Sequence, residues 1–276
     1  MKQPFIMYNL IILLSLFIFP SCKNDELDDY LPEPTNNLSG DTLRFISYNV
    51  YHFGKNPEYP NGNYEIIANV LKDLKPDVVC LQELDSMTTR TNRVYQVKRL
   101  AELNSWNYRY ASTIASYMGG SYGIGVVTPH SISRSSFYKL TSVDEQRGFL
   151  IVEFPKYIMV SCHLGGDEAT RKTQAQELTS KIKELYGNSP KPIFLGGDLN
   201  STPLSDTMKE LYRNWVLISG QDNTLPAGNK CIDYLLMLNQ GNKYKVLESK
   251  VIGFSTYGNM QVESDHYPVM VTIIIP

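Results

Sequence analysis

Carboxylate, amide and imidazole side chains recur where the apolar, strand-like runs of this sequence begin or end. A carboxylate costs several kcal/mol to bury unless it is paired or bound to a metal ion. Each position taken alone is typical of a strand-end or turn residue. Together, beside so many apolar runs, they indicate one site that combines acids, amides and imidazoles. These positions are Asn49, Glu83, His163, Asp198, Asn200, Asp233, Asp265 and His266.

The elements that must position these side chains are short strands and amphipathic helices. Runs rich in Val, Ile, Leu and Phe predict strands, and apolar residues at helical spacing predict helices. Gly187 predicts a helix end, and Ser205 predicts a helix cap. The expected strands cover residues 43–51, 77–82, 123–127, 149–154, 157–163, 193–197, 232–237 and 269–275. The expected helices cover residues 66–74, 97–103, 175–185 and 205 to about 215.

Two stretches of the chain resemble each other. Residues 75–83 and residues 191–198 each follow a helix with Lys-Pro, then an apolar strand, then a carboxylate at the strand's end. Such strands need cover on both faces, and a side chain at the carboxyl end projects into the crevice where α/β folds build sites. The repetition predicts an α/β fold in which two sheets pack face to face with helices outside. No linker interrupts residues 41–276, which form one domain.

A set of short motifs resembles the endonuclease/exonuclease/phosphatase family. The matching pieces, in the family's order, are SYNV at 47–50, LQELD at 81–85, YGIGVV at 122–127, HL at 163–164, GGDLNSTP at 196–203, IDYLL at 232–236 and SDHYPV at 264–269. The combination of GGDLN, LQE and SDHYP is highly specific. The resemblance implies a four-layer α/β sandwich, in which two packed mixed β-sheets are flanked by helices. It also implies phosphoester hydrolysis that depends on Mg²⁺ or Mn²⁺.

The resemblance also suggests roles for individual residues. Asn49, Glu83 and Asp265 would supply oxygen ligands to the metal. Asp198 would orient or deprotonate the attacking water, assisted by Asn200. His266 would contact the phosphate with Asp233 as its partner, and His163 would donate to a phosphoryl oxygen. Tyr122 is either a phosphate contact or an ordinary loop tyrosine. Phosphate contact is one interpretation for Arg90, Arg93 and Arg147, but solvated side chains are favoured for all three. A structural salt bridge is expected for Arg171.

The N-terminus resembles a bacterial lipoprotein signal. Residues 10–19 read LIILLSLFIF, which is too short to span a bilayer and suits an export signal. Residues 1–22 would therefore end at a lipidated Cys22, and the acidic residues 23–40 would form a flexible tether. We expect an exported protein, held by lipid on the outer membrane of the bacterial cell envelope and otherwise free of the membrane. Cys80 and Cys162 lie in apolar runs and are expected to be buried free thiols.

Composition narrows the substrate. The chain has 276 residues, of which 42% are hydrophobic and 20% charged, and a formal charge of −2. The formal charge near zero argues against a protein that binds nucleic acid through bulk positive charge. No apolar hairpin of the kind that dips into a membrane is apparent, which favours a small soluble phosphoester as the substrate. We also expect a monomer. The alternatives are an extracellular DNA or RNA endonuclease, a sphingomyelinase-like phospholipid hydrolase, and a non-catalytic surface-binding lipoprotein.

Overall fold

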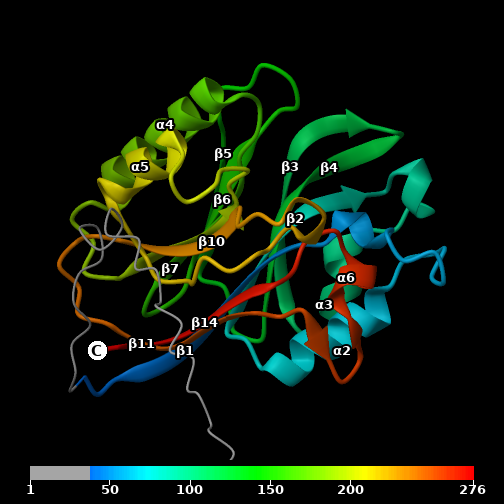
Figure 1. Cartoon of the computed structure of the whole chain (residues 1–276), viewed down its shortest axis with the longest axis horizontal. Coiled ribbons are helices and arrows are strands. Elements are labelled where there is room, and N and C mark those ends of the chain that lie inside the picture. Colours follow the sequence, from blue (N-terminus) through cyan, green and yellow to red (C-terminus); the bar gives the residue numbers. More distant parts are fainter. Residues whose placement is uncertain (1–37) are drawn as a thin grey trace, which may run out of the picture.

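Two mixed β-sheets of six strands each lie face to face, and helices cover both outer faces (Figure 1). The structure is a computed structural model of the chain, and it describes residues 38–276. The predicted export signal and residues 23–37 of the predicted tether lie outside the described residues. Among residues 38–276, no helix combines the length and the apolar character needed to cross a bilayer.

The first sheet holds the N-terminal and C-terminal strands of the body. Its strands, in spatial order, are β11 (Lys245–Val251), β14 (Val269–Ile275), β1 (Asp41–Asn49), β2 (Val78–Ser86), β4 (Gly120–Thr128) and β3 (Asn107–Tyr117). Only β1 and β2 of this sheet are parallel. The helix α2 (Tyr64–Leu74) connects them, and α3 (Gln96–Asn104) follows β2.

The second sheet repeats this plan. Its strands, in spatial order, are β5 (Arg134–Lys139), β6 (Gly148–Glu153), β7 (Ile158–His163), β8 (Ile193–Asp198), β10 (Asp233–Leu238) and β9 (Trp215–Leu217). Again only one pair, β7 and β8, is parallel, and α4 (Glu168–Tyr186) connects it. The doubled unit predicted from the two Lys-Pro stretches is therefore confirmed.

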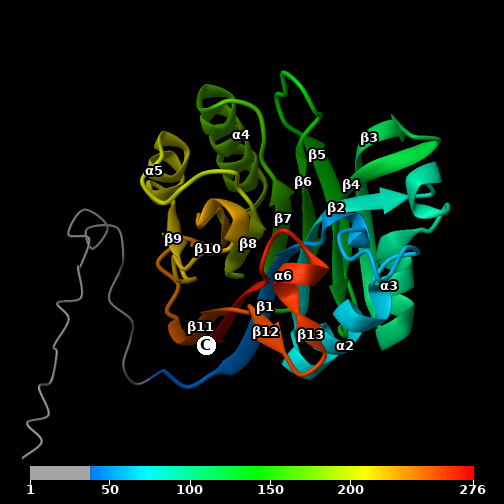
Figure 2. The ribbon, with the colours of Figure 1, turned by 45° about the vertical axis from the view of Figure 1, so that its right-hand side comes forward.

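Apolar side chains hold the four layers together in three clusters. The central cluster lies between the sheets and contains Phe45 and Phe194, whose ring centroids are 4.6 Å apart. Ile182 lies in a second cluster, which joins α4 and α5 (Asp206–Tyr212) to the second sheet. Leu71 lies in a third, which joins α2 and α3 to the first sheet. Figure 2 shows these helices on opposite sides of the sheets, so the predicted four-layer sandwich is confirmed.

Several details differ from the sequence-based expectations. The helix capped by Ser205 ends at Tyr212 instead of near residue 215, because Trp215 pairs with Leu238 in the sheet. The half-exposed strands β3, β5 and β11 and the short strand β9 were not predicted. Gly187 ends α4 as expected, and the free thiols of Cys80 and Cys162 are buried as expected.

An exposed apolar hairpin is present, contrary to expectation. It consists of β12 (Phe254–Ser255) and β13 (Gly258–Asn259), and the short helix α6 (Met260–Glu263) follows it. Phe254 is 77% exposed and Tyr257 is 46% exposed. The sequence pattern concealed this hairpin because its strands have only two residues each and show no alternation.

Candidate active site

Strand register brings three site residues into one row across the second sheet. His163, the last residue of β7, is opposite Asp198, the last residue of β8. Asp198 is in turn opposite Asp233, the first residue of β10. All three side chains are buried. These residues are far apart in the chain, and they meet because each of them is the first or last residue of a strand at the same end of the sheet.

The first sheet contributes Asn49 from the end of β1 and Glu83 from an irregularity within β2. Glu83 has a φ of 58°, a left-handed conformation that is rare within a strand, and it interrupts the pairing of β2 with β4. Such a bulge redirects a side chain, and strain of this kind is common at functional sites. The Nδ2 group of Asn49 donates to Glu83 Oε1 at 3.0 Å. The carboxylate of Glu83 therefore lies beside Asn49, whose amide also contacts Asp198 of the second sheet.

Asp198 lies at the centre of a group of polar side chains, called the catalytic cluster below, whose other members are Asn49, Glu83, His163, Asp233 and His266. Its Oδ2 accepts a hydrogen bond from Asn49 Nδ2 at 3.1 Å, and it lies 3.4 Å from His163 Nε2 and 3.7 Å from His266 Nε2. Its Oδ1 accepts the backbone N–H of Asn200, whose φ of 49° is also left-handed. Burial, and then the nearby carboxylate of Asp233, raise the pKa of Asp198, while His266 opposes this shift. A carboxylate of raised pKa is a stronger base than an ordinary aspartate.

His266 is held between two carboxylates. Its Nδ1 lies 2.8 Å from Asp233 Oδ2, which also accepts the hydroxyl of Thr224 at 2.6 Å. Burial disfavours the charged imidazole, but the charge and hydrogen bond of Asp233, with Asp198 and Asp265, prevail and raise the pKa of His266. The pair therefore presents a positively charged imidazole whose Nε2 faces Asp198.

His163 has the opposite electrostatic character. Burial, Arg147 and His266 lower its pKa well below the usual value, so the ring is neutral. Arg147 approaches His163 Nδ1 at 2.8 Å. Since a guanidinium can only donate, Nδ1 must accept and the single ring proton must lie on Nε2. His163 can thus donate a hydrogen bond from Nε2, and the nearest acceptor is Asp198 Oδ2 at 3.4 Å. The amide Nδ2 of Asn200 lies 3.2 Å from the same nitrogen, but it is itself a donor, which bonds to Leu164 O.

Arg147 was expected to be solvated, and that expectation was wrong. Its side chain is only 13% exposed, it pairs with Glu145 at 2.8 Å, and its Nε has no hydrogen-bond partner among the described residues. Gly165 makes room for it, because a Cβ there would lie 2.4 Å from Nε. The sequence does show Arg147 directly before a predicted strand. Because the first residue of that strand, Gly148, is opposite His163, Arg147 lies next to the imidazole.

The other arginines named from the sequence lie outside this cluster. Arg90 was also expected to be solvated, but it forms two hydrogen bonds with buried Asp85 at 2.6 and 2.8 Å. It lies over the rings of Tyr117 and Tyr122. Arg93 is exposed, as expected. Arg171 pairs with Glu168 at 2.8 Å, which confirms the structural salt bridge.

Tyr122 and Asp265 lie beside the cluster. Tyr122 is buried, and burial followed by the charge of Glu83 raises the pKa of its phenol. It is therefore a neutral hydroxyl near Glu83. Asp265 is half-buried and close enough to Glu83 that its charge raises the pKa of Glu83, although burial is the larger cause. Two neighbouring carboxylates repel each other, and a bound cation would relieve that repulsion.

Two groups of side chains fit a divalent cation. Ligand atoms of Asp198, Asp233 and His266 all lie within 4.8 Å of one another. In that group, however, Asp233 Oδ2 already binds His266 and Thr224. Glu83 and Asp265 instead offer hard oxygens, and the charges of His266 and Arg147 partly offset the carboxylate charge of Glu83. The amide oxygen of Asn49 accepts Tyr51 N–H at 3.1 Å, so metal ligation by Asn49 stays a prediction.

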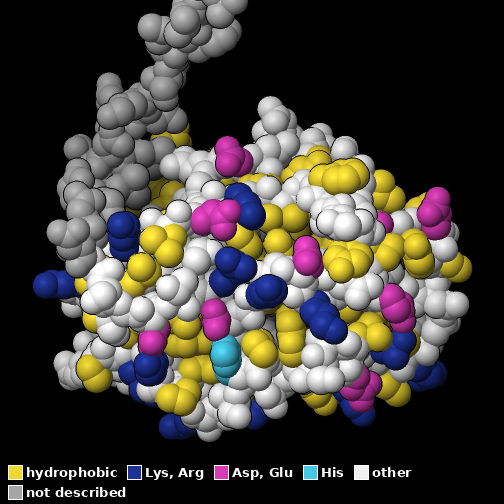
Figure 3. All heavy atoms as spheres, turned by 90° about the horizontal axis from the view of Figure 1, so that it is seen from below, with side chains coloured by type: hydrophobic (Ala, Val, Ile, Leu, Met, Phe, Trp, Pro, Cys, Tyr) yellow, Lys and Arg dark blue, Asp and Glu magenta, His cyan; other side chains and the backbone are white. Residues whose placement is uncertain are grey.

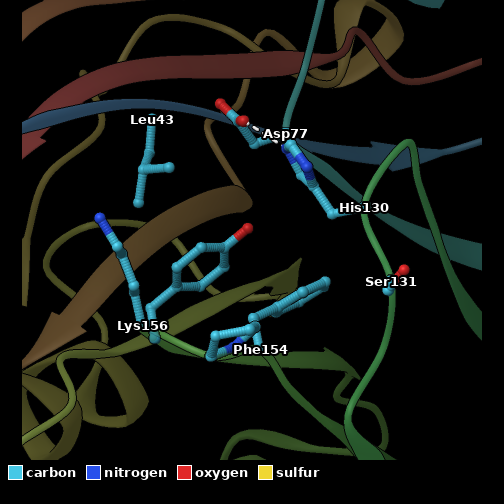
Figure 4. Close-up of a pocket in the computed structure, with 8 residues that line it drawn as sticks. Leu43, Asp77, His130, Ser131, Phe154 and Lys156 are labelled. Atoms are coloured by element: carbon cyan, nitrogen blue, oxygen red, sulfur yellow. Dashed lines mark hydrogen bonds and ion pairs between the residues drawn. The ribbon is translucent and has the colours of Figure 1, made fainter.

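A separate pocket of about 340 Å³ lies at the other end of the strands (Figure 4). Leu43 lines it near the start of β1, Asp77 lines it just before β2, and Tyr157 lines it just before β7. Figure 4 shows the Asp77–His130 pair, 2.6 Å apart, at its rim. None of the predicted site residues lines this pocket. The residues with catalytic chemistry lie at the opposite ends of these strands.

Comparison with known proteins agrees with this geometry. Residues 46–239 match the model of the Endonuclease/Exonuclease/phosphatase family. A phospholipase C of Staphylococcus aureus is 24% identical, with 82% of this chain and 86% of that protein covered. A crystal structure of an endonuclease/exonuclease/phosphatase from Bacteroides vulgatus superposes with a TM-score of 0.69, at 17% identity, covering 86% of this chain and 100% of that one. A mannosyl-6-phosphatase of Bacteroides thetaiotaomicron has a TM-score of 0.63, at 18% identity, covering 84% and 100%.

Proposed function

Because the chain belongs to the endonuclease/exonuclease/phosphatase family, we propose that it is a divalent-metal-dependent phosphoester hydrolase, either a phosphodiesterase or a phosphatase. One observation carries the proposal. Asp198 Oδ2 lies 3.1 Å from Asn49 Nδ2, 3.4 Å from His163 Nε2 and 3.7 Å from His266 Nε2. An acid, an amide and two imidazoles thus surround one point in the crevice between the sheets.

The reaction assigned to this site is attack of water on phosphorus. Asp198 takes the proton of the water as the new O–P bond forms and the bond to the leaving oxygen breaks, a step that its raised pKa favours. His266, kept charged by Asp233, binds a phosphate oxygen, and neutral His163 donates from Nε2 to another. In this proposal Tyr122 and Asn200 orient the phosphate or the water. When bound, Mg²⁺ or Mn²⁺ at Glu83 and Asp265 would screen the negative charge that develops on the oxygens.

The test is hydrolysis of bis-p-nitrophenyl phosphate with Mg²⁺, Mn²⁺ or excess EDTA. We expect turnover with metal and none with EDTA, and the Asp198→Ala protein serves as the inactive control. A panel of plasmid DNA, RNA, sphingomyelin and inositol phosphates would then identify the substrate class. If no phosphoester were hydrolysed with either metal, the chain would instead be a surface-binding protein that retains the fold.

Phospholipid hydrolysis is the second candidate function. It is supported by the similarity to a phospholipase C over 82% of this chain and by the exposed Phe254 and Tyr257 of the β12–β13 hairpin. Phe254→Ser should then reduce activity on sphingomyelin vesicles and leave activity on bis-p-nitrophenyl phosphate unchanged. Equal activity of both proteins on vesicles would remove this candidate.

Nucleic acid is less favoured as a substrate, although it stays among the alternatives. The formal charge of the chain is −2. On the face shown in Figure 3, basic side chains are interspersed with acidic ones. A nuclease commonly grips the backbone with a continuous basic surface. Cleavage of plasmid DNA in the substrate panel tests this alternative directly.

We also propose that the protein is exported as a monomer and held on the bacterial outer membrane by a lipid at Cys22. The support is the sequence pattern of residues 1–22. Detergent partitioning of the full chain and of Cys22→Ser tests it, with the unmodified chain expected in the detergent phase and the variant in water. Size-exclusion chromatography with light scattering tests the oligomeric state.

A further inference from the structure

A second cavity adjoins the catalytic cluster on the Asn200 side. Its volume is about 240 Å³, and Arg171, Asn200, Ser201, Thr202 and Lys230 are among the residues that line it. Asn200 joins the cavity to the cluster, because its Nδ2 lies 3.2 Å from His163 Nε2. Pockets that hold an entire ligand usually measure about 300–1,000 Å³. This cavity therefore suits one portion of a substrate whose phosphate lies at Asp198.

The charge of this cavity is positive. Arg171 is the first cation, and its charge is balanced by Glu168, which also accepts two hydrogen bonds from Thr207. Lys230 is the second cation, and its ammonium group has no hydrogen-bond or ion-pair partner among residues 38–276. Ser201 accepts a hydrogen bond from Arg171 Nε at 3.0 Å, so its own hydroxyl proton is free to be donated.

The loop that carries Lys230 is fixed to the catalytic cluster. The backbone N–H groups of Thr224 and Leu225 both donate to Lys230 O at 2.9 Å. Thr224 also donates to Asp233 Oδ2 at 2.6 Å, and Asp233 holds His266. Thr224 thus holds both the backbone at Lys230 and the carboxylate of Asp233. Lys230 is itself exposed, so these contacts fix its backbone while its side chain lines the cavity.

We propose that this cavity is a subsite for a second anionic group of the substrate, so that the chain acts on small phosphoesters that carry two negatively charged groups. The proposal rests on the proposed phosphoester hydrolysis and narrows its substrate class. The reacting phosphate lies at Asp198, and the second anion lies near Lys230 and Ser201. An anion there receives a charge-assisted hydrogen bond in addition to simple attraction.

The test is a comparison of glucose 1,6-bisphosphate with glucose 1-phosphate and glucose 6-phosphate by isothermal titration calorimetry with Mg²⁺. All proteins carry Asp198→Asn, so that nothing is hydrolysed during the titration. We expect the bisphosphate to bind about tenfold more tightly than either monophosphate. The advantage should vanish in Lys230→Gln and persist in Lys230→Arg. Lys209→Gln is the matched control, since Lys209 is exposed on α5 and does not line the cavity.

Two results would overturn the subsite. One is equal affinity for the bisphosphate and the monophosphates, and the other is an advantage that survives in Lys230→Gln. The proposed hydrolysis is tested separately, by release of nitrophenol from the protein that retains Asp198. If the protein hydrolyses nitrophenyl esters but binds the three sugar phosphates equally, the proposed hydrolysis stands and the proposed subsite is wrong.

Discussion

Arg147 donates to Nδ1 of His163 over a distance of 2.8 Å, and this contact fixes the imidazole proton on Nε2. In Arg147→Met the proton of His163 should no longer be confined to Nε2, so His163 would lose its alignment as a donor. We expect kcat to fall by about 10²-fold, the usual cost of losing one aligned donor. The measurement is steady-state hydrolysis of bis-p-nitrophenyl phosphate. Arg93→Met is the control because Arg93 is exposed. Equal kcat values for the two variants would contradict the role given to Arg147.

Asp198→Ala and His266→Ala should each lower turnover by at least ~10²-fold, as losses of a general base and of a charged donor commonly do. Asp198 is the last residue of β8 and His266 lies in the segment between α6 and β14, so neither substitution interrupts the pairing of a strand interior and the sheets should remain intact. Circular dichroism spectra should match the wild-type spectrum. Near-normal turnover in either variant would remove the role assigned to that residue.

Asp233→Asn should change the pH dependence of kcat/KM. The Asp233 carboxylate raises the pKa of His266 against the opposing effect of burial. Activity that needs a charged His266 is present at low pH and is lost as the pH rises through that pKa. Without the carboxylate the pKa falls, so the alkaline loss should move to lower pH by about one unit or more.

Asp222→Asn is the matched control for this pH profile, because it removes an exposed carboxylate from the same loop. Its alkaline limb should coincide with that of the wild-type protein. If the alkaline loss of activity in Asp233→Asn occurred at the same pH as well, the effect of the Asp233 charge on His266 would have no part in the activity.

Glu83→Gln should weaken activation by the metal. Glutamine keeps the shape and the contact with Asn49 but removes the negative charge that would balance a cation. The Mg²⁺ concentration for half-maximal activity should rise, by about tenfold or more. An unchanged Mg²⁺ titration would exclude Glu83 as a ligand. Glu65→Gln, an exposed acid on α2, is the control.

The thiols of Cys80, Cys162 and Cys231 should resist modification in the native protein. All three are buried, and burial raises the pKa of each, to about 12 for Cys80 and Cys231. Reaction with a disulfide reagent needs the thiolate, so it should occur only after unfolding. The assay is absorbance of the released thiol with and without guanidinium chloride. Rapid labelling of the folded protein would contradict this burial.

Much of this arrangement could be predicted from the sequence, for a physical reason. The two parallel pairs β1–β2 and β7–β8 are buried, so their apolar runs and the polar residues that end them are visible in the pattern. The edge strands β3 and β5 are half-exposed and lack that signal. Arg147 was misjudged because its burial depends on the register of β6 with β7 and on the space at Gly165, which local sequence does not encode.

The direction of β1 gives the molecule two functionally distinct poles. The strand enters the body at Asp41 and ends at Asn49, within the catalytic cluster. The strand has nine residues and therefore eight steps of about 3.3 Å, which put roughly 26 Å between those points. Attachment at the N-terminal pole would therefore leave the opposite pole open to incoming solutes. If the predicted lipid at Cys22 anchors the chain, changes in the length of the predicted tether, residues 23–40, would alter how far the candidate active site extends from the membrane.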